Sequence, residues 1–194
     1  MRVVIECADT VAQEATAQKI CEEVFCREWG LNLSCSSSYD PEKKRTLIAR
    51  CGLTREPVAT LTVVETTGDA ELHQRVGLRL ERGERAARYT RLAVLKPYRG
   101  LHIPNQLILK AQQEFVIPRK IDVTWLLFDA QRARFSWLCG VLGYEASLRI
   151  FATEYGLSRL LVRREAGAAA ATSNLQAHAF LQAQRLNMGL QSSL

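Results

Sequence analysis

The segment "LAVLKPYRGLHIP", residues 92–104, has the composition of a phosphate-binding turn. An apolar, strand-like run leads into a basic turn that contains Arg99 and Gly100, and a helical pattern begins directly afterwards. A strand that delivers such a turn to a helix N-terminus places backbone N–H groups and the positive end of the helix dipole around an anion. The positions where phosphate loops usually have glycine hold His102 and Pro104, and Pro104 has no N–H to donate. The sequence therefore predicts a phosphate-bearing ligand that tolerates a glycine-poor turn.

A run of arginines precedes this turn, in the segment "RVGLRLERGERAARYTR" at residues 75–91. With a net charge of +6 and a pI of about 9.2, the chain favours an acidic partner or ligand. A solvated basic face and a surface for an acidic protein or anionic cofactor both stay open as interpretations. No helix-turn-helix, zinc-finger or aromatic RNA-binding pattern accompanies the charge, so we expect no nucleic-acid partner.

The six cysteines and three histidines do not form a metal-binding pattern. No C-x-x-C pair occurs, and His73, His102 and His178 complete no zinc-ligand spacing. A chain of this size without a secretory signal usually keeps its cysteines as thiols. We therefore expect structural thiols, with zinc as the alternative.

The periodicity of apolar residues predicts the elements that must position the turn. Strands are expected at 2–6, 46–52 and 56–67, the last two as an antiparallel pair, and a helix at 9–30 begins with an aspartate cap. Residues 69–83 fit either a short helix or a structured loop.

The second half of the chain predicts a strand–helix–strand crossover within a mixed α/β sheet. One domain should span residues 1–165, and residues 166–194, rich in Ala, Gln and Ser, should form a helix or tail packed on it. The elements expected here are strands at 87–95, 122–130, 144–154 and 157–165 and helices at 105–116 and 131–143.

The chain shows no apolar stretch of the length that a membrane helix needs, and its N-terminus lacks the pattern of a secretory signal. We therefore expect a cytoplasmic protein without stable membrane insertion. Nothing in the sequence predicts its oligomeric state.

The order of these elements and the residues of the turn resemble the Gcn5-related N-acetyltransferase (GNAT) fold. Proteins of this fold have an apolar strand ending in "L-x-V", followed by "x-P-x-Y-R-G-x-G-I-G" at the start of a helix, and residues 92–104 follow this pattern except at the later glycines. The segment "LGYE" at 142–145 is similar to the family's "LGF/Y-E". The resemblance covers roughly residues 45–164 and implies a mixed, mostly antiparallel sheet flanked by helices, with acyltransferase activity.

A narrower resemblance is to the N-acyl amino acid synthases. This group includes long-chain N-acyl tyrosine synthases from environmental DNA and is related to the acyl-homoserine lactone synthases. Its pattern "E-x-x-R-L-A-V" is matched by residues 91–94, whereas Arg88 stands where the glutamate is expected. An "N-P-R-H-x-x-F-Y"-like turn of that group is replaced here by "DAQRARFS", so Asp129, Arg132 and Ser136 depart from it.

The resemblance implies that a pantetheine thioester donates the acyl group and that no cofactor is permanently bound. The strand after "L-x-V" would pair with the pantetheine arm, and the turn would hold its phosphate. A carrier protein presents pantetheine through one phosphodiester, which needs less of the turn than the pyrophosphate of coenzyme A, and the arginines could meet its acidic surface. Acyl carrier protein is therefore the expected partner, with coenzyme A as the alternative. The residues expected to bind the donor are Leu92, Ala93, Val94, Arg99, Gly100, Leu101, His102 and Ile103.

The reaction that the resemblance implies is attack of a neutral amine on the thioester. Glu65, at the end of "TLTVVE", would remove the proton of the amine, although a solvated strand-end glutamate fits the same position. Arg91 would hold the carboxylate of an amino-acid acceptor. The position at which the family often has a tyrosine acid holds Cys139, which fits a core thiol better.

We expect an N-acyl amino acid synthase that moves a long-chain fatty acyl group from acyl carrier protein to the α-amine of an amino acid, with tyrosine as the example that the resemblance suggests. The alternatives are an ordinary N-acetyltransferase that uses acetyl-coenzyme A and a non-catalytic binding module of the same fold. Trp125, Phe128 and Trp137 would line a pocket for the acyl tail or an aromatic acceptor, or would belong to the core.

Overall fold

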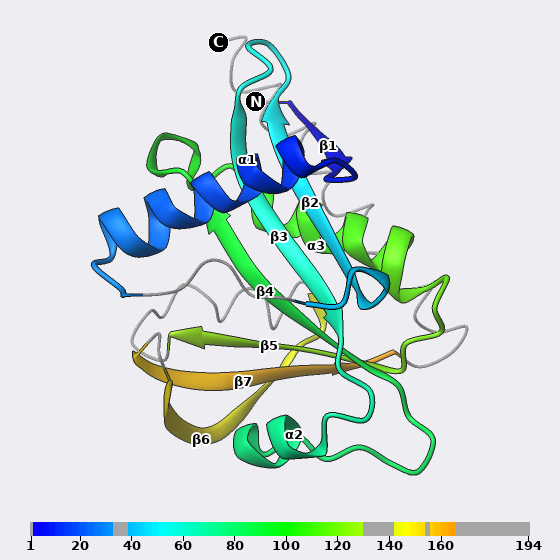
Figure 1. Cartoon of the computed structure of the whole chain (residues 1–194). Coiled ribbons are helices and arrows are strands. Elements are labelled where there is room, and N and C mark those ends of the chain that lie inside the picture. The colour runs from blue at the N-terminus through cyan, green and yellow to red at the C-terminus, as the bar shows by residue number, and fades with distance from the viewer. Residues whose placement is uncertain (1, 33–38, 130–141, 154–155, 166–194) are drawn as a thin grey trace, which may run out of the picture.

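Seven strands form one mixed sheet in the computed structural model, which describes residues 2–32, 39–129, 142–153 and 156–165 (Figure 1). Their order is β1-β2-β3-β4-β5-β7-β6, and every neighbouring pair is antiparallel except β4 and β5, which are parallel. This topology confirms the predicted mixed, mostly antiparallel sheet. The strands are β1 (Val3–Cys7), β2 (Lys44–Cys51), β3 (Pro57–Glu65), β4 (Ala86–Val94), β5 (Val123–Asp129), β6 (Glu145–Thr153) and β7 (Gly156–Arg164).

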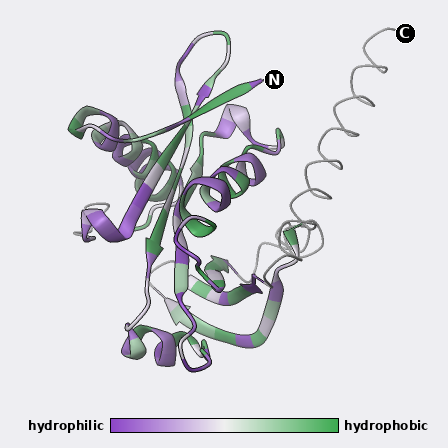
Figure 2. Ribbon diagram, turned by 90° about the vertical axis from the view of Figure 1, so that its right-hand side faces the viewer, coloured by the Kyte–Doolittle hydropathy of each residue, from purple (hydrophilic) through white to green (hydrophobic). Residues whose placement is uncertain are grey.

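Helices lie on both sides of these strands, as the turned view in Figure 2 shows. In Figure 1, α1 crosses in front of β2 and β3, α3 lies behind the sheet, and α2 lies below β5 and β7. Two of the α-helices continue directly into π-helical segments, α1 into η1 and α3 into η4. The helical segments are α1 (Val11–Cys21), η1 (Glu22–Glu28), η2 (Pro41–Lys43), α2 (Ala70–Val76), η3 (Lys96–Tyr98), α3 (Ile103–Ala111) and η4 (Gln112–Val116).

Local capping residues set the helix boundaries. The side chain of Thr10 accepts the backbone N–H of Gln13, and the side chain of Gln13 accepts that of Thr10, so a capping box starts α1. Asp69 caps α2, and Gly77 ends it with a left-handed backbone (φ 76°) that glycine adopts without steric cost. The ambiguous segment 69–83 is therefore a short helix followed by a loop.

Alternation along β4 sends successive side chains to opposite faces of the sheet. Ala87 and Tyr89 pack in the main core on the α3 side. Ala86 packs with Trp125 in a second core beneath α2, and Ala93 packs in a third against α1. Because three separate cores hold β4, the strand that leads into the turn has a fixed position.

No helix in the described part of the chain has both the length and the apolar character needed to cross a membrane. Within the same residues, no group of His, Cys, Asp and Glu side chains is arranged to hold a metal ion. Cys35 and Cys139 lie outside the described residues, as does most of the helix predicted at 131–143. Cys7, Cys21, Cys26 and Cys51 lie within the described residues and form no disulfide there.

A buried polar cluster joins α2 to the sheet. The Nε2 of His73 lies 3.1 Å from Thr66 Oγ1, and the indole N–H of Trp125 donates to the same oxygen at 3.1 Å. The His73 and Trp125 rings meet edge to face, with 6.1 Å between their centroids. Burial lowers the pKa of His73, and the charge of Asp69 opposes this effect.

We expect the free energy of unfolding to fall as the pH drops below about 6.5, where an unfolded histidine begins to take up a proton. Because the pKa of His73 is lowered in the folded protein, the unfolded chain binds more protons in this range, and the loss is at most about 1.4 kcal/mol per pH unit. Urea unfolding at a series of pH values measures this dependence, and His73→Gln should flatten it. An equally steep dependence in the variant would show that other groups cause it.

Candidate functional site

The parallel strands β4 and β5 separate towards their carboxyl ends. They pair only from Ala86 opposite Val123 to Tyr89 opposite Leu126. Beyond this point β4 stays with β3 and β5 stays with β7, and their arrowheads point apart in Figure 1. The facing edges carry backbone N–H and C=O groups that no described strand uses, so an extended ligand could pair with them.

A β-bulge interrupts β4 inside this cleft. Thr62 opposes Thr90, whereas Thr60 opposes Ala93, so β4 has one residue more than β3 between the two pairs. Arg91 lies in the bulge with φ 54°, in the left-handed region that costs a non-glycine residue about 1–2 kcal/mol. Bulges redirect backbone groups, and an N–H turned away from β3 here could polarise a carbonyl in the cleft.

The surroundings of Arg91 lie on the α1 side of the sheet. Its guanidinium is 5.7 Å from the centroid of the Tyr39 ring. The Cys21 thiol of α1 points at the Arg91 carbonyl oxygen, with 3.9 Å between Sγ and O. These contacts hold the bulge between α1 and the segment that precedes β2.

The turn between β4 and α3 has backbone conformations typical of glycine both at Gly100 and at His102. Gly100 has φ 83°, and His102 has φ 55° and ψ 22°, the left-handed conformation that glycine adopts most easily. Pro104 is the second residue of α3, where backbone N–H groups have no partner inside the helix, so the missing donor breaks no helical hydrogen bond. His102 therefore has a backbone conformation typical of glycine, and Pro104 occupies a helix position that needs no donor within the helix.

Arg99 fixes the turn to η1. Its guanidinium makes two hydrogen bonds to the Glu28 carboxylate, of 2.5 and 2.6 Å, and its Nε–H donates to the Val94 carbonyl at 3.0 Å. The hydrogen bond from Arg99 is the main reason that the pKa of Glu28 is lowered. The positive charge of Arg99 is therefore largely compensated. Lys96 is exposed and makes no ion pair with any described residue.

The residues predicted to bind the donor form one continuous strand, turn and helix start. Ala93 is 1% exposed and packs towards α1, whereas Leu92 and Val94 are partly buried against the main core. Ile103 is 1% exposed and anchors α3 in the core, while Leu101 is exposed. In the strand and at the start of α3, backbone groups rather than side chains are therefore the parts available to a ligand, whereas the side chain of Leu101 in the turn is also accessible.

The structure does not bring Glu65 to this site. Glu65 opposes Ala87 at the beginning of β4, whereas the bulge and the turn lie towards the end of that strand. Its carboxylate forms ion pairs with Arg85 at 2.8 Å and Arg119 at 3.4 Å. Both ion pairs hold the carboxylate where β4 begins, away from the bulge and the turn. We therefore do not retain Glu65 as the base.

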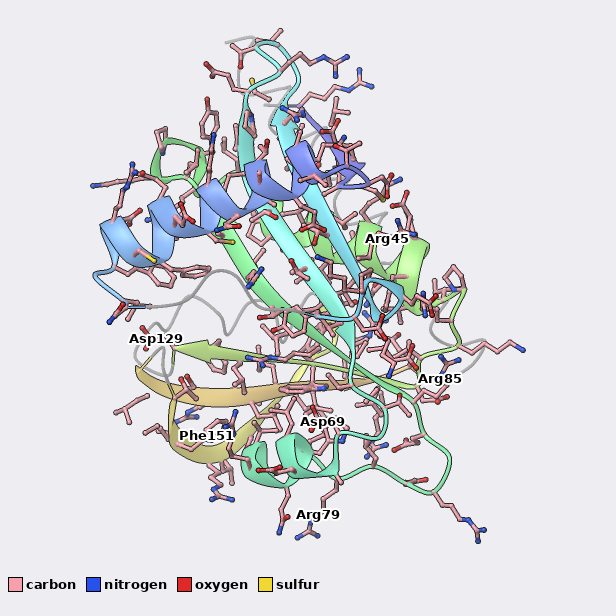
Figure 3. The ribbon with its side chains drawn as sticks, in the orientation of Figure 1. Arg45, Asp69, Arg79, Arg85, Asp129 and Phe151 are labelled. Carbon is pink, nitrogen blue, oxygen red and sulfur yellow. The ribbon has the colours of Figure 1, made fainter. Side chains whose placement is uncertain are left out.

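The basic segment also lies away from the turn. Arg79, Arg82 and Arg85 precede β4, and the nine residues of that strand place the turn roughly 30 Å away. In Figure 3, Arg79 and Arg85 lie at the lower and right-hand parts of the molecule, whereas Asp129 marks the opposite end of β5. These arginines therefore cannot contact a carrier protein at its phosphate attachment in the way that the sequence suggested.

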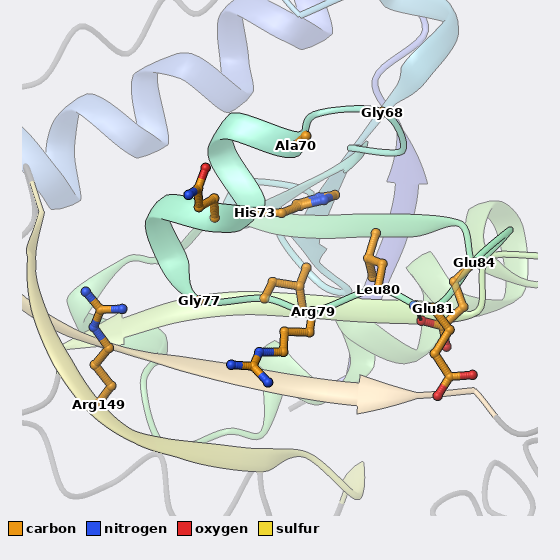
Figure 4. A pocket seen from close by; sticks show the side chains of 11 residues that line it. Gly68, Ala70, His73, Gly77, Arg79, Leu80, Glu81, Glu84 and Arg149 are labelled. Atoms are coloured by element: carbon orange, nitrogen blue, oxygen red, sulfur yellow. Dashed lines mark hydrogen bonds between the residues drawn. The ribbon is translucent and has the colours of Figure 1, made fainter.

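A groove of about 600 Å³ lies between α2 with its following loop and strand β6. Figure 4 shows the side chains of Arg79 and Arg149 along one side of it and those of Glu81 and Glu84 at one end. None of the turn residues lines this groove, so it is separate from the cleft between β4 and β5.

Two sequence-derived expectations concern aromatic and acid residues. Trp125 is 0% exposed and belongs to the core beneath α2, as one of the two interpretations predicted. Phe128 is partly buried beside the main core. Cys139 and Trp137 lie outside the described residues, so their roles stay predictions.

Arg88 belongs to the arginine run at residues 75–91 and stands where the related group has a glutamate, and the sequence assigned it no role in the site. In the structure, Arg88 opposes Trp125 next to the point where β4 and β5 separate, and its guanidinium is 5.2 Å from the Trp125 ring centroid. The signal that could have identified it was present: an arginine stood where the related group has a glutamate, which reverses the charge beside the cleft.

Comparison with known proteins identifies the fold. No family model matches the sequence, and no curated protein is significantly similar to it. A proposed N-acetyltransferase from Lactobacillus plantarum superposes with a TM-score of 0.62 at 17% identity, over 84% of this chain and 99% of its own. FeeM, an N-acyl amino acid synthase from uncultured soil microbes, gives 0.60 at 11% identity, over 84% and 91%. BjaI, a coenzyme A-dependent acyl-homoserine lactone synthase, gives 0.61 at 15%, over 91% and 89%. The chain therefore has the GNAT fold.

Proposed function

We propose that this protein is an N-acyltransferase that moves an acyl group from a pantetheine thioester to an amine. The observation that carries the proposal is the separation of β4 from β5 beside a bulge, with a helix N-terminus at the end of the same strand. The edge of β4 can pair with the extended pantetheine arm of the donor. The backbone N–H groups at the start of the helix can bind the phosphate of the same donor.

The chemistry follows from this order of features. With the phosphate at the turn and the arm along β4, the thioester carbonyl would lie near the bulge, where a backbone N–H can stabilise its developing negative charge. The amine nitrogen forms the new bond to the carbonyl carbon and loses one proton, the carbon–sulfur bond breaks, and the leaving thiolate takes up one proton, so the step releases an amide and a thiol. Holding both reactants in one cleft lowers the entropic cost of their encounter.

The finer proposal is that the donor is a long-chain acyl carrier protein and the acceptor an amino acid, for which tyrosine is the example from the related group. Glu28 compensates the charge of Arg99, and Lys96 is exposed in the same turn. This arrangement suits the single phosphodiester of a carrier protein better than the more highly charged pyrophosphate of coenzyme A. The likeness to FeeM in fold is consistent with this assignment.

A matched pair of variants tests the role of charge at the turn. Glu28→Gln should release Arg99 to face a phosphate, so KM for a coenzyme A ester should fall several-fold, with a smaller change for the carrier ester. Glu23→Gln removes the same charge from the same π-helical segment, but Glu23 pairs with the exposed Arg27 and should leave both KM values unchanged. If KM for coenzyme A esters is the same in the parent and both variants, Arg99 does not limit donor choice.

The second candidate is an N-acetyltransferase that uses acetyl-coenzyme A. It is favoured by the left-handed conformation of His102, which preserves the turn shape that a pyrophosphate would need. Under this candidate, acetyl-coenzyme A would be turned over faster than any long-chain carrier ester.

Backbone NMR with a stable thioether analogue of acyl-pantetheine phosphate tests where the donor binds. We expect the largest amide shifts at residues 90–94 and 100–103. Shifts confined to the groove beside α2 would place the donor elsewhere and contradict the proposal.

A further inference from the structure

We propose that Arg88 forms a binding site for the carboxylate of the acceptor, so that the acceptor class is an amino acid rather than a simple amine. This inference rests on the N-acyltransferase function proposed above. It assigns acceptor recognition to a residue at the closed end of the cleft, in place of Arg91.

The position of Arg88 suits contact with an acceptor. It belongs to the next-to-last pair between β4 and β5, and the strands separate after the following pair, Tyr89 with Leu126. Arg91 in the bulge is three residues further along, roughly 10 Å for an extended strand. An arginine side chain and the length of an α-amino acid together cover most of that distance, so a carboxylate held at Arg88 would leave the amine near the bulge.

Arg88 lies on the side of the sheet opposite to the turn that would hold the donor. Ala87 and Tyr89 point to the α3 side, so Arg88 points to the opposite side, where Ala86 and Trp125 pack beneath α2. The turn that would hold the donor phosphate leads into α3. Donor and acceptor would therefore be held on opposite sides of the sheet and meet at the gap between β4 and β5.

Among the described residues, no carboxylate pairs with the guanidinium of Arg88. Its Nε is buried without a hydrogen-bond partner, and among the described residues its one polar contact is the cation–π contact with the Trp125 ring at 5.2 Å. Two other arginines of the sheet each pair with a carboxylate: Arg50 of β2 with Glu6, and Arg163 of β7 with Glu165. A partly buried cation without such a partner is unfavourable, and a carboxylate from a ligand would complete it.

Trp125 holds this guanidinium in place. The indole is completely buried, and its N–H donates to Thr66 Oγ1 at 3.1 Å. Stacking on a fixed ring leaves the edge of the guanidinium available for the paired hydrogen bonds that a carboxylate accepts. Arg91, by contrast, lies in the bulge, and its guanidinium is over the Tyr39 ring. This contact accompanies the left-handed backbone conformation of Arg91.

The test compares amino acids with their amides as acceptors. The parent protein and the variants Arg88→Gln and Arg88→Lys are each given a thioester donor with a mixture of amino acids or of the corresponding amides, and the products are measured by mass. Arg88→Gln should lower kcat/KM for the amino acids about tenfold to a hundredfold and leave that for the amides nearly unchanged. Arg88→Lys keeps the positive charge but loses the paired hydrogen-bond donors of the guanidinium. Its kcat/KM for amino acids should therefore lie between the values of the parent and of Arg88→Gln. Arg79→Gln, an exposed arginine away from the cleft, should behave like the parent.

A binding measurement separates this inference from the proposed function. The indole N–H NMR signal of Trp125 should shift when the amino-acid mixture is added to the parent, and should not shift in Arg88→Gln. If the parent accepts acids and amides equally, if the variant loses both equally, or if amino acids leave the indole signal of the parent unchanged, Arg88 does not hold a carboxylate. A parent that forms no amide product at all while the indole signal still shifts would remove the proposed function and keep the binding site.

Discussion

A dodecanoyl to hexadecanoyl group is expected to be transferred from acyl carrier protein with a kcat/KM about tenfold or more above that of the matching coenzyme A ester. The physical reason lies in the turn after β4, where Glu28 binds both terminal nitrogens of Arg99. A second phosphate would have to be desolvated there without a full positive charge to compensate it. A difference of one charge-assisted hydrogen bond, about 1.4 kcal/mol, accounts for the tenfold ratio.

The comparison requires the same acyl chain on both donors, the same acceptor mixture and the same ionic strength, because contacts between exposed charges weaken with salt. The double variant Arg79→Glu, Arg82→Glu is a useful control, since both exposed residues precede β4, lie roughly 30 Å from the turn and should not alter the ratio. A kcat/KM for the coenzyme A ester that equals or exceeds that of the carrier ester would favour the acetyltransferase candidate.

Replacing Arg163 with methionine is expected to reduce the free energy of unfolding by about 3–5 kcal/mol. Arg163 is 6% exposed, its Nη2 lies 3.0 Å from the Glu165 carboxylate, and its Nη1 donates to the Leu142 carbonyl at 3.0 Å. Thr124 adds a hydrogen bond to the same carboxylate at 3.2 Å. Without Arg163, the buried carboxylate of Glu165 would have no cation beside it. Removing one partner of a buried ion pair is among the few single substitutions that lower the free energy of unfolding by several kcal/mol.

The pH dependence of this loss has a definite sign. Burial already raises the pKa of Glu165, and Arg163 opposes that effect, so its removal should raise the pKa further. The variant would then gain stability relative to the parent as the pH falls and Glu165 becomes neutral, and urea unfolding at about pH 5 and pH 8 measures the change. Arg164→Gln breaks an exposed ion pair with Glu84 and should cost less than about 1 kcal/mol. A loss of that small size in Arg163→Met would show that Glu165 is not held in a costly environment.

The sequence predicted the strand, turn and helix at residues 87–116 because each leaves a local signal: an apolar run, a Pro- and Gly-containing turn and a helical period. It did not predict the bulge, because Arg91 adopts a left-handed backbone for which arginine carries no local preference. Nor did it predict how His102 and Pro104 would fit the turn: the histidine adopts a conformation typical of glycine, and the proline lies in the first turn of a helix.

The misplacement of Glu65 and of the basic segment has one topological cause. Neighbouring antiparallel strands run in opposite directions, so the end of β3 lies beside the beginning of β4 and far from the turn that follows β4. The arginines at 75–85 lie in the connection between these two strands and are placed at the same distant end. Pairing the predicted strands before assigning roles would have excluded both assignments. The sequence marked Arg88 as a reversal of charge, whereas its contact with Trp125 across β4 and β5 became visible only in the structure.

The most direct test of the account is whether the purified protein forms an amide from a pantetheine thioester. The full chain is incubated with acyl carrier protein and coenzyme A thioesters of acetyl to hexadecanoyl groups and with a mixture of amino acids, and products are identified by mass while the released thiol is titrated. We expect an N-acyl amino acid in an amount that matches the thiol released. Binding of a thioester without any amide product would contradict it and would favour a non-catalytic module with the same fold.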